Sequence, residues 1–332
     1  MPEDQVNDLL LEVKDLSVAF NSDEGEVEAL DRVSFDIRKG ETMGLVGESG
    51  CGKSVTAYSI MNLLPQPIGR ITSGEINFLS HDLLSLSSEE LRKFRGNDIG
   101  MIFQEPMNAL NPVQKIGNQL SEVFLIHQDI SDHQAWLSSI EMLDSVGIPS
   151  PENRAHEYPH QLSGGMRQRV VIAMALACQP KLIIADEPTT ALDVTVQAQI
   201  LELLENSQKN SGASILLITH DLGVIAETCD MVCVMYAGRV VEKGSTTKIF
   251  ANPSHAYTQD LLSSIPRING EPKTKLKTID GIVPSLFDLN EGCRFGPRSG
   301  EEHTEELLSR RPEMKEVSQG HWVEGCPICA KL

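Results

Sequence analysis

The chain has 332 residues and a formal net charge of −19, from 47 acidic against 28 basic side chains. Binding to a nucleic-acid backbone is driven by Lys and Arg that displace counterions, so this excess of acid argues against a nucleic-acid partner. Apolar residues make up 40% of the chain and charged residues 23%, which is ordinary for a soluble globular protein of one large domain or two.

The N-terminus and the cysteines indicate the compartment. The first residues, MPEDQVNDLLLEVKD, are acidic where a secretory signal is basic and then apolar. The longest apolar run, Val170 to Cys178, is far shorter than the roughly 20 residues that cross a bilayer. Seven cysteines are an odd and sparse set that does not suggest a disulfide framework. We therefore expect a soluble cytoplasmic chain whose membrane role, if it has one, is exercised through partners.

The first predicted elements lead into a glycine-rich loop. Residues 9–37 contain LEVKDLSVAF and RVSFDI, whose alternation around a polar turn predicts antiparallel strands. Residues 43–46 predict a short buried strand, and VTAYSIMNLL predicts a helix. The loop between them matches the phosphate-binding pattern G-x-x-x-x-G-K-[ST] through Gly47, Glu48, Ser49, Gly50, Cys51, Gly52, Lys53 and Ser54.

This loop predicts a nucleoside triphosphate site. Its glycines let backbone N–H groups turn inward around phosphate oxygens, where a Cβ would block the approach. We expect Lys53 to neutralise the β- and γ-phosphates, Ser54 to ligate Mg²⁺, and the following helix to direct its positive end at the phosphates. Cys51 stands at the start of that helix, where a thiol tends toward a low pKa. We therefore expect alkylation of Cys51 to block ATP hydrolysis and bound nucleotide to protect it.

Two carboxylates and a second glycine pair follow in the middle of the chain. The apolar run LIIA ends in Asp186 and Glu187, as a central parallel strand does when it delivers acids to the edge of a sheet. Asp186 is then placed for Mg²⁺ and Glu187 for the attacking water. Ser163 stands where the N-cap of a helix belongs, and Gly164 and Gly165 after it form a second anion site on the same chain.

The residues LSGGMRQR around these glycines resemble the signature of ATP-binding cassette (ABC) ATPases. In that family two cassettes pack head to tail, and the signature of one closes over the nucleotide of the other. The resemblance covers about residues 8–250. It implies an α/β fold with a RecA-like core of parallel strands, an antiparallel β subdomain and a helical signature subdomain at about residues 112–166.

The resemblance also assigns roles to four further residues. Phe20 resembles the aromatic residue that stacks on adenine, and Asp193 resembles the aspartate that crosses the cassette dimer. Gln104 resembles the glutamine that ligates Mg²⁺ and contacts the membrane subunits. His220, after the apolar strand SILLIT, resembles the histidine that touches the γ-phosphate. Taken singly, Gln104 and His220 are typical of plain polar residues at strand ends; their order and spacing after Lys53 favour the family roles.

The residues after about position 252 narrow the family. The segment HAYTQDLLSSIPR, residues 255–267, resembles the His-Pro-Tyr-Thr…Leu-Leu…Ile-Pro segment of dipeptide and oligopeptide importer ATPases, with Ala256 in place of the proline. The segments LKTIDGIVP and GCRFGPR continue this match. We therefore expect an ABC ATPase domain at residues 1–252 and an importer-type C-terminal extension at residues 253–332.

The resemblance implies a transport ATPase that uses ATP and Mg²⁺ to power uptake of dipeptides or oligopeptides. The implied partners are two transmembrane permease subunits, a second ABC ATPase that we expect to be a different chain, and an extracytoplasmic substrate-binding protein. The chain is then peripheral, on the cytoplasmic face of the inner (plasma) membrane. Nickel, glycan and antimicrobial-peptide importers share the subfamily, so the substrate stays open, and a soluble ABC ATPase outside transport is a further alternative.

The cysteines near the end of the sequence raise the question of a metal. In many members of the subfamily this segment carries four cysteines that hold an iron–sulfur cluster, which normally takes four thiolates. This chain has Cys293, Cys326 and Cys329, but Ser299 stands where a further cysteine is expected, and another cysteine expected near Leu307 is missing. The iron–sulfur cluster is therefore the family property that the resemblance predicts least well for this chain.

Two alternatives to the cluster stay open. Three thiolates, aided by His303 or His321, suit Zn²⁺ in a tetrahedral site. A tail without metal, packed by Phe295, Trp322 and Val323, is the other alternative and is the one that we expect from the sequence.

Overall fold

The computed structural model describes residues 8–190, 193–265 and 279–332. These residues divide into two units, each assembled from separate stretches of the chain. The first unit contains residues 8–10, Ile37–Glu41 and Ser85–Ile218, and the second contains Leu11–Asp36, Thr42–Leu84 and Thr219–Leu332. In the part of the chain that is described, we find no helix both long and apolar enough to span a membrane.

Three parallel strands form the sheet of the first unit: β6 (Ile99–Ile102), β7 (Leu182–Asp186) and β8 (Ser214–Ile218). β7 lies between the other two, and all three are buried at every position. Strands buried on both faces need apolar side chains throughout, which is why these segments are continuous apolar runs in the sequence. The carboxyl end of β7 carries Asp186, as the sequence predicted.

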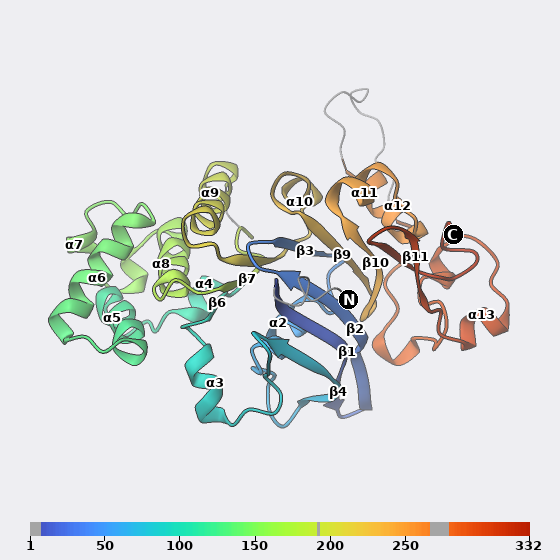
Figure 1. Cartoon of the computed structure of the whole chain (residues 1–332), viewed down its shortest axis with the longest axis horizontal. Coiled ribbons are helices and arrows are strands. Elements are labelled where there is room, and N and C mark those ends of the chain that lie inside the picture. The colour runs from blue at the N-terminus through green and yellow to red at the C-terminus, as the bar shows by residue number, and fades with distance from the viewer. Residues whose placement is uncertain (1–7, 191–192, 266–278) are drawn as a thin grey trace. The chain divides into compact units, whose positions relative to one another are not determined.

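Helices make up the rest of the first unit, and α5, α6 and α7 gather beside α8 in Figure 1. Ser131 and Gln134 form a capping box at the start of α6, and Ser121 and Ser139 share a buried hydrogen bond of 2.9 Å between α5 and α6. The helices are α3 (Ser88–Phe94), α4 (Pro106–Ala109), α5 (Ile116–His127), α6 (Asp132–Ser145), α7 (Pro151–Arg154), the 3₁₀ turn η1 (Pro159–Gln161), α8 (Gly164–Leu176) and α9 (Val194–Ser211).

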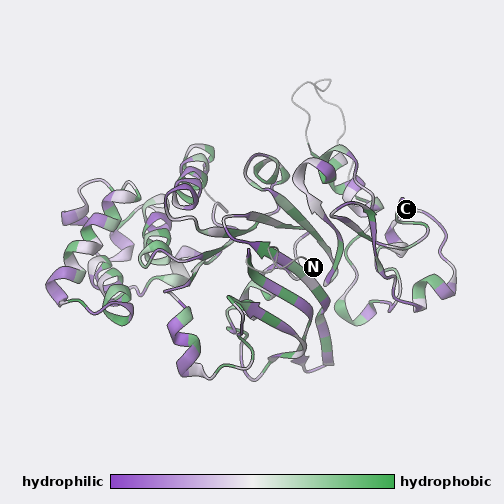
Figure 2. Cartoon of the chain, in the orientation of Figure 1, coloured by the Kyte–Doolittle hydropathy of each residue, from purple (hydrophilic) through white to green (hydrophobic). Residues whose placement is uncertain are grey.

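An antiparallel sheet, most of which belongs to the second unit, has the order β2-β1-β4-β5. Its strands are β1 (Leu9–Ser22), β2 (Gly25–Arg38), β4 (Gly69–Phe78) and β5 (His81–Asp82). β4 pairs antiparallel with both β1 and β5. Side chains along β2 alternate between buried and exposed, and Figure 2 shows the matching bands of hydrophobic and hydrophilic colour.

The second unit also contains a run of strands in the order β11-β12-β10-β9-β3. β3 and β9 are parallel, and the remaining neighbours are antiparallel. β12 pairs with β10, so the segment expected as an extension continues the sheet of the cassette. The strands are β3 (Thr42–Val46), β9 (Met231–Tyr236), β10 (Arg239–Ser245), β11 (Met314–Ser318) and β12 (His321–Glu324).

The helices of the second unit are short. α2 follows the glycine-rich loop, and α12 lies in the segment that resembles importer ATPases. The elements are α2 (Lys53–Ile60), α10 (Leu222–Thr228), α11 (Thr246–Ala251), α12 (Ala256–Ser263), η2 (Leu286–Asp288), η3 (Gly296–Arg298) and α13 (Glu305–Ser309). Residues 266–278, which contain part of the importer-like sequence, lie outside the described residues.

Candidate functional site

The phosphate loop lies between β3 and α2 and needs glycine at two positions. Gly47 has φ 151° and Gly52 has φ 107°. A Cβ on Gly47 would approach the Met235 carbonyl oxygen to 2.2 Å, so both conformation and space exclude a side chain there. Lys53 is 5% exposed and donates to the carbonyl oxygens of Gly47 and Glu48 at 2.8 and 3.0 Å. The backbone of the loop thus holds the ammonium group that the sequence assigns to the phosphates.

Cys51 is buried and does not have the low pKa that its position suggested. Its side chain is only 1% exposed, and its Sγ lies 3.8 Å from Lys53 Nζ. Burial raises the pKa of the Cys51 thiol, although Lys53 acts in the opposite direction. The prediction of a lowered pKa was wrong because desolvation by the surrounding fold outweighs the helix N-terminus and the lysine, whereas the effect of alkylation on hydrolysis stays a prediction.

Two side chains from beyond residue 252 hold the phosphate loop at Glu48. The Tyr257 hydroxyl accepts a hydrogen bond of 2.9 Å from the Glu48 N–H, and Arg298 donates to the two carboxylate oxygens of Glu48 at 2.8 and 3.2 Å. The Arg298 guanidinium also lies 5.7 Å from the centre of the Tyr236 ring. Tyr236, Tyr257 and Phe295 pack ring against ring, with centroids 4.7 to 5.4 Å apart. Sequence reasoning missed these contacts, although it singled out the two segments that supply Tyr257 and Arg298.

Phe20 and His220 also belong to the second unit. Phe20 is half-buried and lies opposite Gly69 in the β1–β4 register. A Cβ on Gly69 would come within 2.7 Å of the Phe20 ring, so the glycine makes room for the aromatic side chain. His220 is exposed. Their roles toward adenine and the γ-phosphate remain predictions.

In the first unit, Glu187 is the centre of a small hydrogen-bonded group. Gln104 Nε2 donates to Glu187 Oε2 at 3.0 Å, and Thr190 Oγ1 donates to the same oxygen at 2.8 Å. Glu187 has φ 46°, a conformation rare outside glycine that persists only where the surroundings hold it, and its N–H donates to the Ile218 carbonyl at 2.9 Å. Asp186, directly before it, is fully buried. The structure thus brings the predicted base together with the predicted magnesium-sensing glutamine.

The signature segment begins α8 and is linked to the turn after Glu187. The Ser163 side chain accepts from the Met166 N–H, as the sequence predicted for an N-cap. Gln168, which is 2% exposed, donates to the Pro188 carbonyl at 2.7 Å. Asp193 caps α9 by accepting from the Val196 N–H at 3.0 Å. The signature helix is therefore linked by a hydrogen bond to the residue after Glu187, the carboxylate that the sequence predicts as the base.

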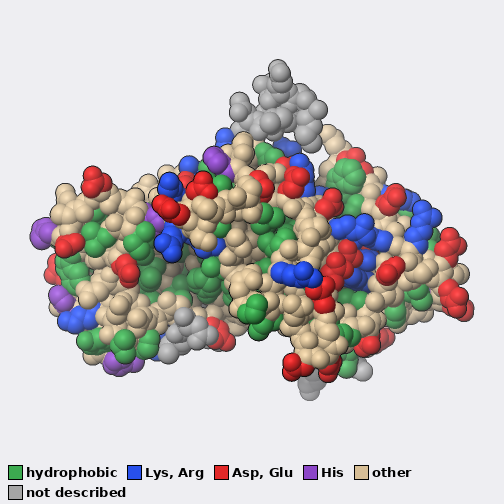
Figure 3. All heavy atoms as spheres, turned by 90° about the horizontal axis from the view of Figure 1, so that it is seen from below, with side chains coloured by type: hydrophobic (Ala, Val, Ile, Leu, Met, Phe, Trp, Pro, Cys, Tyr) green, Lys and Arg blue, Asp and Glu red, His purple; other side chains and the backbone are tan. Residues whose placement is uncertain are grey.

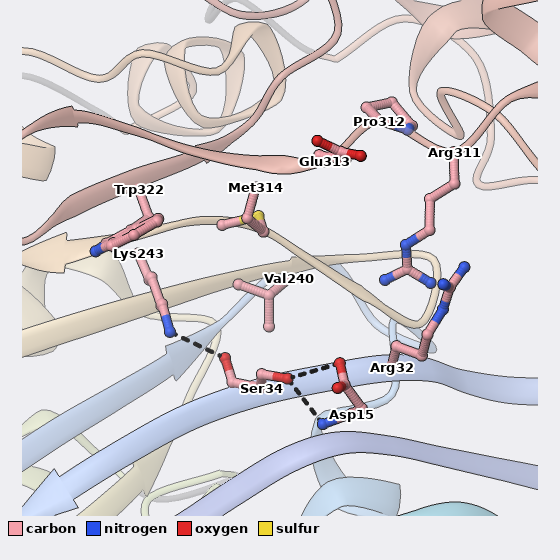
Figure 4. Close-up of a pocket in the computed structure, with 10 residues that line it drawn as sticks. All are labelled: Asp15, Arg32, Ser34, Val240, Lys243, Arg311, Pro312, Glu313, Met314 and Trp322. Atoms are coloured by element: carbon pink, nitrogen blue, oxygen red, sulfur yellow. Dashed lines mark hydrogen bonds between the residues drawn. The ribbon is translucent and has the colours of Figure 1, made fainter.

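A cavity of about 480 Å³ lies elsewhere in the second unit (Figure 4). Within it, Ser34 accepts from the Asp15 N–H at 2.8 Å, and Lys243 donates to the Ser34 carbonyl at 3.3 Å. None of its lining residues carries a predicted nucleotide role, so this cavity does not mark the nucleotide site. The lining residues are Asp15, Arg32, Ser34, Val240, Lys243, Arg311, Pro312, Glu313, Met314 and Trp322.

The cysteines of the C-terminal segment converge on one histidine. Cys293, Cys326, Cys329 and His303 place one potential ligand atom each within 4.8 Å of all the others. His321, the other histidine considered from the sequence, is instead bonded through Nε2 to the buried Glu242 carboxylate at 2.7 Å. The fold therefore selects His303 as the fourth member of the group.

Comparison with known proteins identifies two matching families along the chain. Residues 30–190 match the ABC transporter family, and residues 241–305 match the C-terminal region of oligopeptide/dipeptide transporters. The chain is 51% identical to the oligopeptide transport ATP-binding protein OppD of Bacillus subtilis (strain 168), over 95% of this chain and 88% of that protein. It is 53% identical to the dipeptide transport ATP-binding protein DppD of the same strain, over 87% of this chain and 86% of that protein.

A solved structure supports the fold. The dimeric post-hydrolysis state of the ATP-binding cassette MJ0796, bound to ADP and Pi, has a TM-score of 0.65 at 28% identity. The match covers 71% of this chain and 99% of that one. The chain is therefore a member of the ABC transporter family, an ATPase cassette that carries the C-terminal region of oligopeptide/dipeptide transporters.

Proposed function

We propose that this chain is the ATP-hydrolysing subunit of an importer for dipeptides or oligopeptides. The observation that carries the proposal is the hydrogen-bonded group at the end of β7, where Gln104 and Thr190 hold the carboxylate of Glu187, the predicted base. The relatives that match over most of the chain are named for oligopeptide and dipeptide transport. An importer subunit needs both a working ATPase and the importer-type C-terminal region, and this chain has the sequence features of both.

Each predicted residue has a defined task in hydrolysis. The loop from Gly47 to Ser54 binds the triphosphate, Lys53 neutralises its negative charge, and Phe20 supports adenine. Glu187 orients and deprotonates the attacking water, a contribution typically worth about 10²- to 10⁴-fold in rate. His220 contacts the γ-phosphate.

The residues predicted to bind magnesium carry hard oxygen donors. The Ser54 hydroxyl, the Gln104 side-chain oxygen and the Asp186 carboxylate are the ligand types that Mg²⁺ prefers. When bound, the ion neutralises the charge that develops on the phosphate oxygens. Gln104 donates through its nitrogen to Glu187, which leaves its side-chain oxygen as the group available for the metal.

A second cassette completes the catalytic cycle in this proposal. Ser163, Gly164, Gly165 and Asp193 close over the nucleotide held by the partner cassette, which we expect to be a different chain. ATP drives this closure because it binds the closed dimer more tightly than the open one. Hydrolysis then allows the dimer to reopen.

Closure and reopening of the cassette dimer change the conformation of two permease subunits in the membrane, and an extracytoplasmic binding protein delivers the peptide to them. Val113 and Ile126 of the first unit are 78% and 64% exposed, as apolar residues at a protein interface are in the absence of the partner. The proposal places the chain peripherally on the cytoplasmic face of the inner membrane. It also keeps residues 1–252 as the ATPase domain and residues 253–332 as the importer-type extension.

The alternatives are the same ATPase role for nickel, a glycan or an antimicrobial peptide, and a soluble ABC ATPase outside transport. Nucleic-acid binding is disfavoured, because the net charge is −19 and because Figure 3 shows Lys and Arg interspersed with Asp and Glu on the face drawn. Permease subunits and a binding protein determine selectivity in such importers, so the choice of substrate is tested on the complex.

Uptake by a deletion strain tests the proposal. The strain, complemented with wild-type chain or with Glu187→Gln, is supplied with a dipeptide, an oligopeptide or nickel as separate substrates. We expect peptide uptake with the wild type only, and co-purification of the chain with two permease subunits. Nickel uptake without peptide uptake would select the first alternative, and an ATPase that never associates with membrane subunits would select the soluble one.

A further inference from the structure

The group formed by Cys293, His303, Cys326 and Cys329 is compact and shielded. The Sγ atoms of Cys293 and Cys329 are 3.6 Å apart, and His303 Nε2 lies 3.6 Å from the Sγ of Cys326 and 3.4 Å from that of Cys329. The three cysteines are 0 to 2% exposed, and none is in a disulfide. Four soft or nitrogen donors that converge in this way define a potential metal site.

The spacing of these atoms is that of ligands around a single ion. With Zn–S bonds of about 2.3 Å and a Zn–N bond of about 2.05 Å, tetrahedral angles separate two sulfurs by about 3.8 Å and a sulfur from a nitrogen by about 3.6 Å. The separations of 3.6, 3.6 and 3.4 Å lie close to these values. We propose that Cys293, His303, Cys326 and Cys329 form a mononuclear, tetrahedral zinc site, in place of the iron–sulfur cluster that the family resemblance implies.

The surroundings orient the donors as they do in structural zinc sites. His303 Nδ1 lies 3.0 Å from the Glu301 carbonyl, an arrangement in which Nδ1–H donates to that oxygen and Nε2 keeps its lone pair for the metal. Cys326 and Cys329 have the C-x-x-C spacing of zinc ligands.

The residues do not fit a four-thiolate cluster. Three cysteines are present in this segment, and Ser299 and Leu307, at or near the other two positions where the family carries cysteine, offer no thiolate. Ser299 Oγ donates to the Gly296 carbonyl at 2.8 Å, and the Leu307 carbonyl accepts from the Cys293 N–H at 2.9 Å. In a four-iron cluster each cysteine binds a different iron, so the ligand sulfurs stand farther apart than around one ion. Ligand atoms that all lie within 4.8 Å of one another suit one ion.

The zinc site joins two stretches of chain next to the phosphate loop. Between the ligands Cys293 and His303 lies Arg298, which binds Glu48 in that loop. On the other side, the Cys329 carbonyl accepts from the Ala256 N–H at 2.7 Å, at the start of the helix that carries Tyr257. The metal thus fixes both segments that contact Glu48, and its role is structural.

Metal analysis of the full chain tests this proposal. The protein is purified anaerobically from cells grown with both zinc and iron, with a tag free of histidine and without chelator. We expect one zinc per chain, no acid-labile sulfide and no brown colour. After exchange into cobalt(II), the visible bands of a tetrahedral thiolate site should appear, and these bands do not depend on ATPase activity.

Single substitutions assign the ligands. His303→Ala and Cys329→Ser should each weaken zinc retention against a chelator at least about tenfold. His133→Ala and Cys178→Ser, which replace residues outside the group, serve as matched controls and should retain zinc as the wild type does. Iron with sulfide in the wild type, a wild type without metal, or His303→Ala with wild-type retention would each overturn the proposal. If a ligand variant does not fold, the metal content and cobalt spectrum of the wild type decide the question alone.

Discussion

Replacement of Arg298 by Gln should make the phosphate loop less stable, although Arg298 lies 250 residues after Glu48 in the sequence. Arg298 binds both carboxylate oxygens of Glu48 and lies over the Tyr236 ring, and its side chain is 5% exposed. Gln keeps part of the length but loses the charge and the two-pronged geometry. Tyr257 still accepts from the Glu48 backbone in this variant, so we expect a looser loop rather than an unfolded one.

The magnitude follows from the exposure of the two partners. Hydrogen bonds to charged groups contribute about 1.5–3 kcal/mol, and a cation–π contact adds about 0.5–1 kcal/mol. Glu48 is 28% exposed, so in the variant water solvates part of its charge. We therefore expect the free energy of unfolding to fall by about 2 kcal/mol.

The kinetic effect should appear in KM rather than in kcat. Arg298 contacts the loop and not the reacting groups, so its loss weakens ground-state and transition-state binding alike. If the free energy of ATP binding weakens by about 1.4 kcal/mol, KM for ATP rises about tenfold while kcat stays within about twofold. Steady-state ATPase kinetics measure the split, and urea unfolding measures stability.

A matched substitution and a double-mutant cycle make the test sharp. Arg70→Gln removes an arginine whose ion pair with Glu26 is exposed on both sides, at 56% and 45%, and should change stability by no more than about 0.5 kcal/mol. The cycle of Arg298→Gln with Glu48→Gln isolates the energy of their interaction. If Arg298→Gln behaves like Arg70→Gln, or if the interaction energy is zero, then Arg298 does not brace the loop.

Three further predictions follow from single side chains. Glu187→Gln should lower ATP turnover at least about 10²-fold while ATP still binds, and should accumulate an ATP-bound dimer visible in gel filtration; rapid turnover would show that another group is the base. Cys51 should react with a maleimide more slowly than the half-buried Cys178 in the native protein, as mapped by mass spectrometry, and fast stoichiometric labelling of Cys51 would contradict its burial and raised pKa. Asp31→Asn should lower stability at neutral pH and flatten its acid dependence in urea unfolding, whereas an unchanged pH profile would refute the role of Asp31.

The sign of the Asp31 effect comes from its surroundings. Burial acts to raise the pKa of the Asp31 carboxyl, but Arg239, Arg311 and Arg294 outweigh it and leave the pKa lowered from 3.8. A carboxyl whose pKa is lower in the folded state binds protons more weakly there than in the unfolded chain. Its contribution is therefore fully present above the unfolded value of 3.8 and is lost as the pH falls through the lower folded pKa.

Local patterns predicted the parts of the fold that depend on local chemistry. β3, β7 and β8 are buried throughout, so continuous apolar runs marked them, and the Ser163 cap follows from one residue before a helix. β4 escaped prediction because most of its side chains are not fully buried and its sequence, GRITSGEINF, shows little alternation.

Local sequence patterns could not predict contacts between residues that are far apart in the chain. Nothing near Arg298 in sequence reveals Glu48 as its partner, and nothing near Cys51 reveals the burial that raises its pKa. His303 and His321 stand comparably near the cysteines in sequence, and only the pairing of β12 with β10, which accompanies the bond from His321 to Glu242, separates their roles. These assignments depend on tertiary structure, which a single sequence does not display.

The way β12 and its neighbours attach to the cassette limits how such proteins can recombine. Glu242 of β10 is fully buried. Its carboxylate accepts hydrogen bonds from the backbone N–H groups of Ser254 and His255 and is also bonded to His321 Nε2. A chimera that joins this cassette to another relative's C-terminal region inherits a buried carboxylate that the new region must satisfy. The buried Asp31 imposes the same condition through Arg294, and the partly exposed Glu48 loses an ion pair if the new region lacks Arg298. The cassette and the C-terminal region are therefore exchangeable between relatives only as a matched pair.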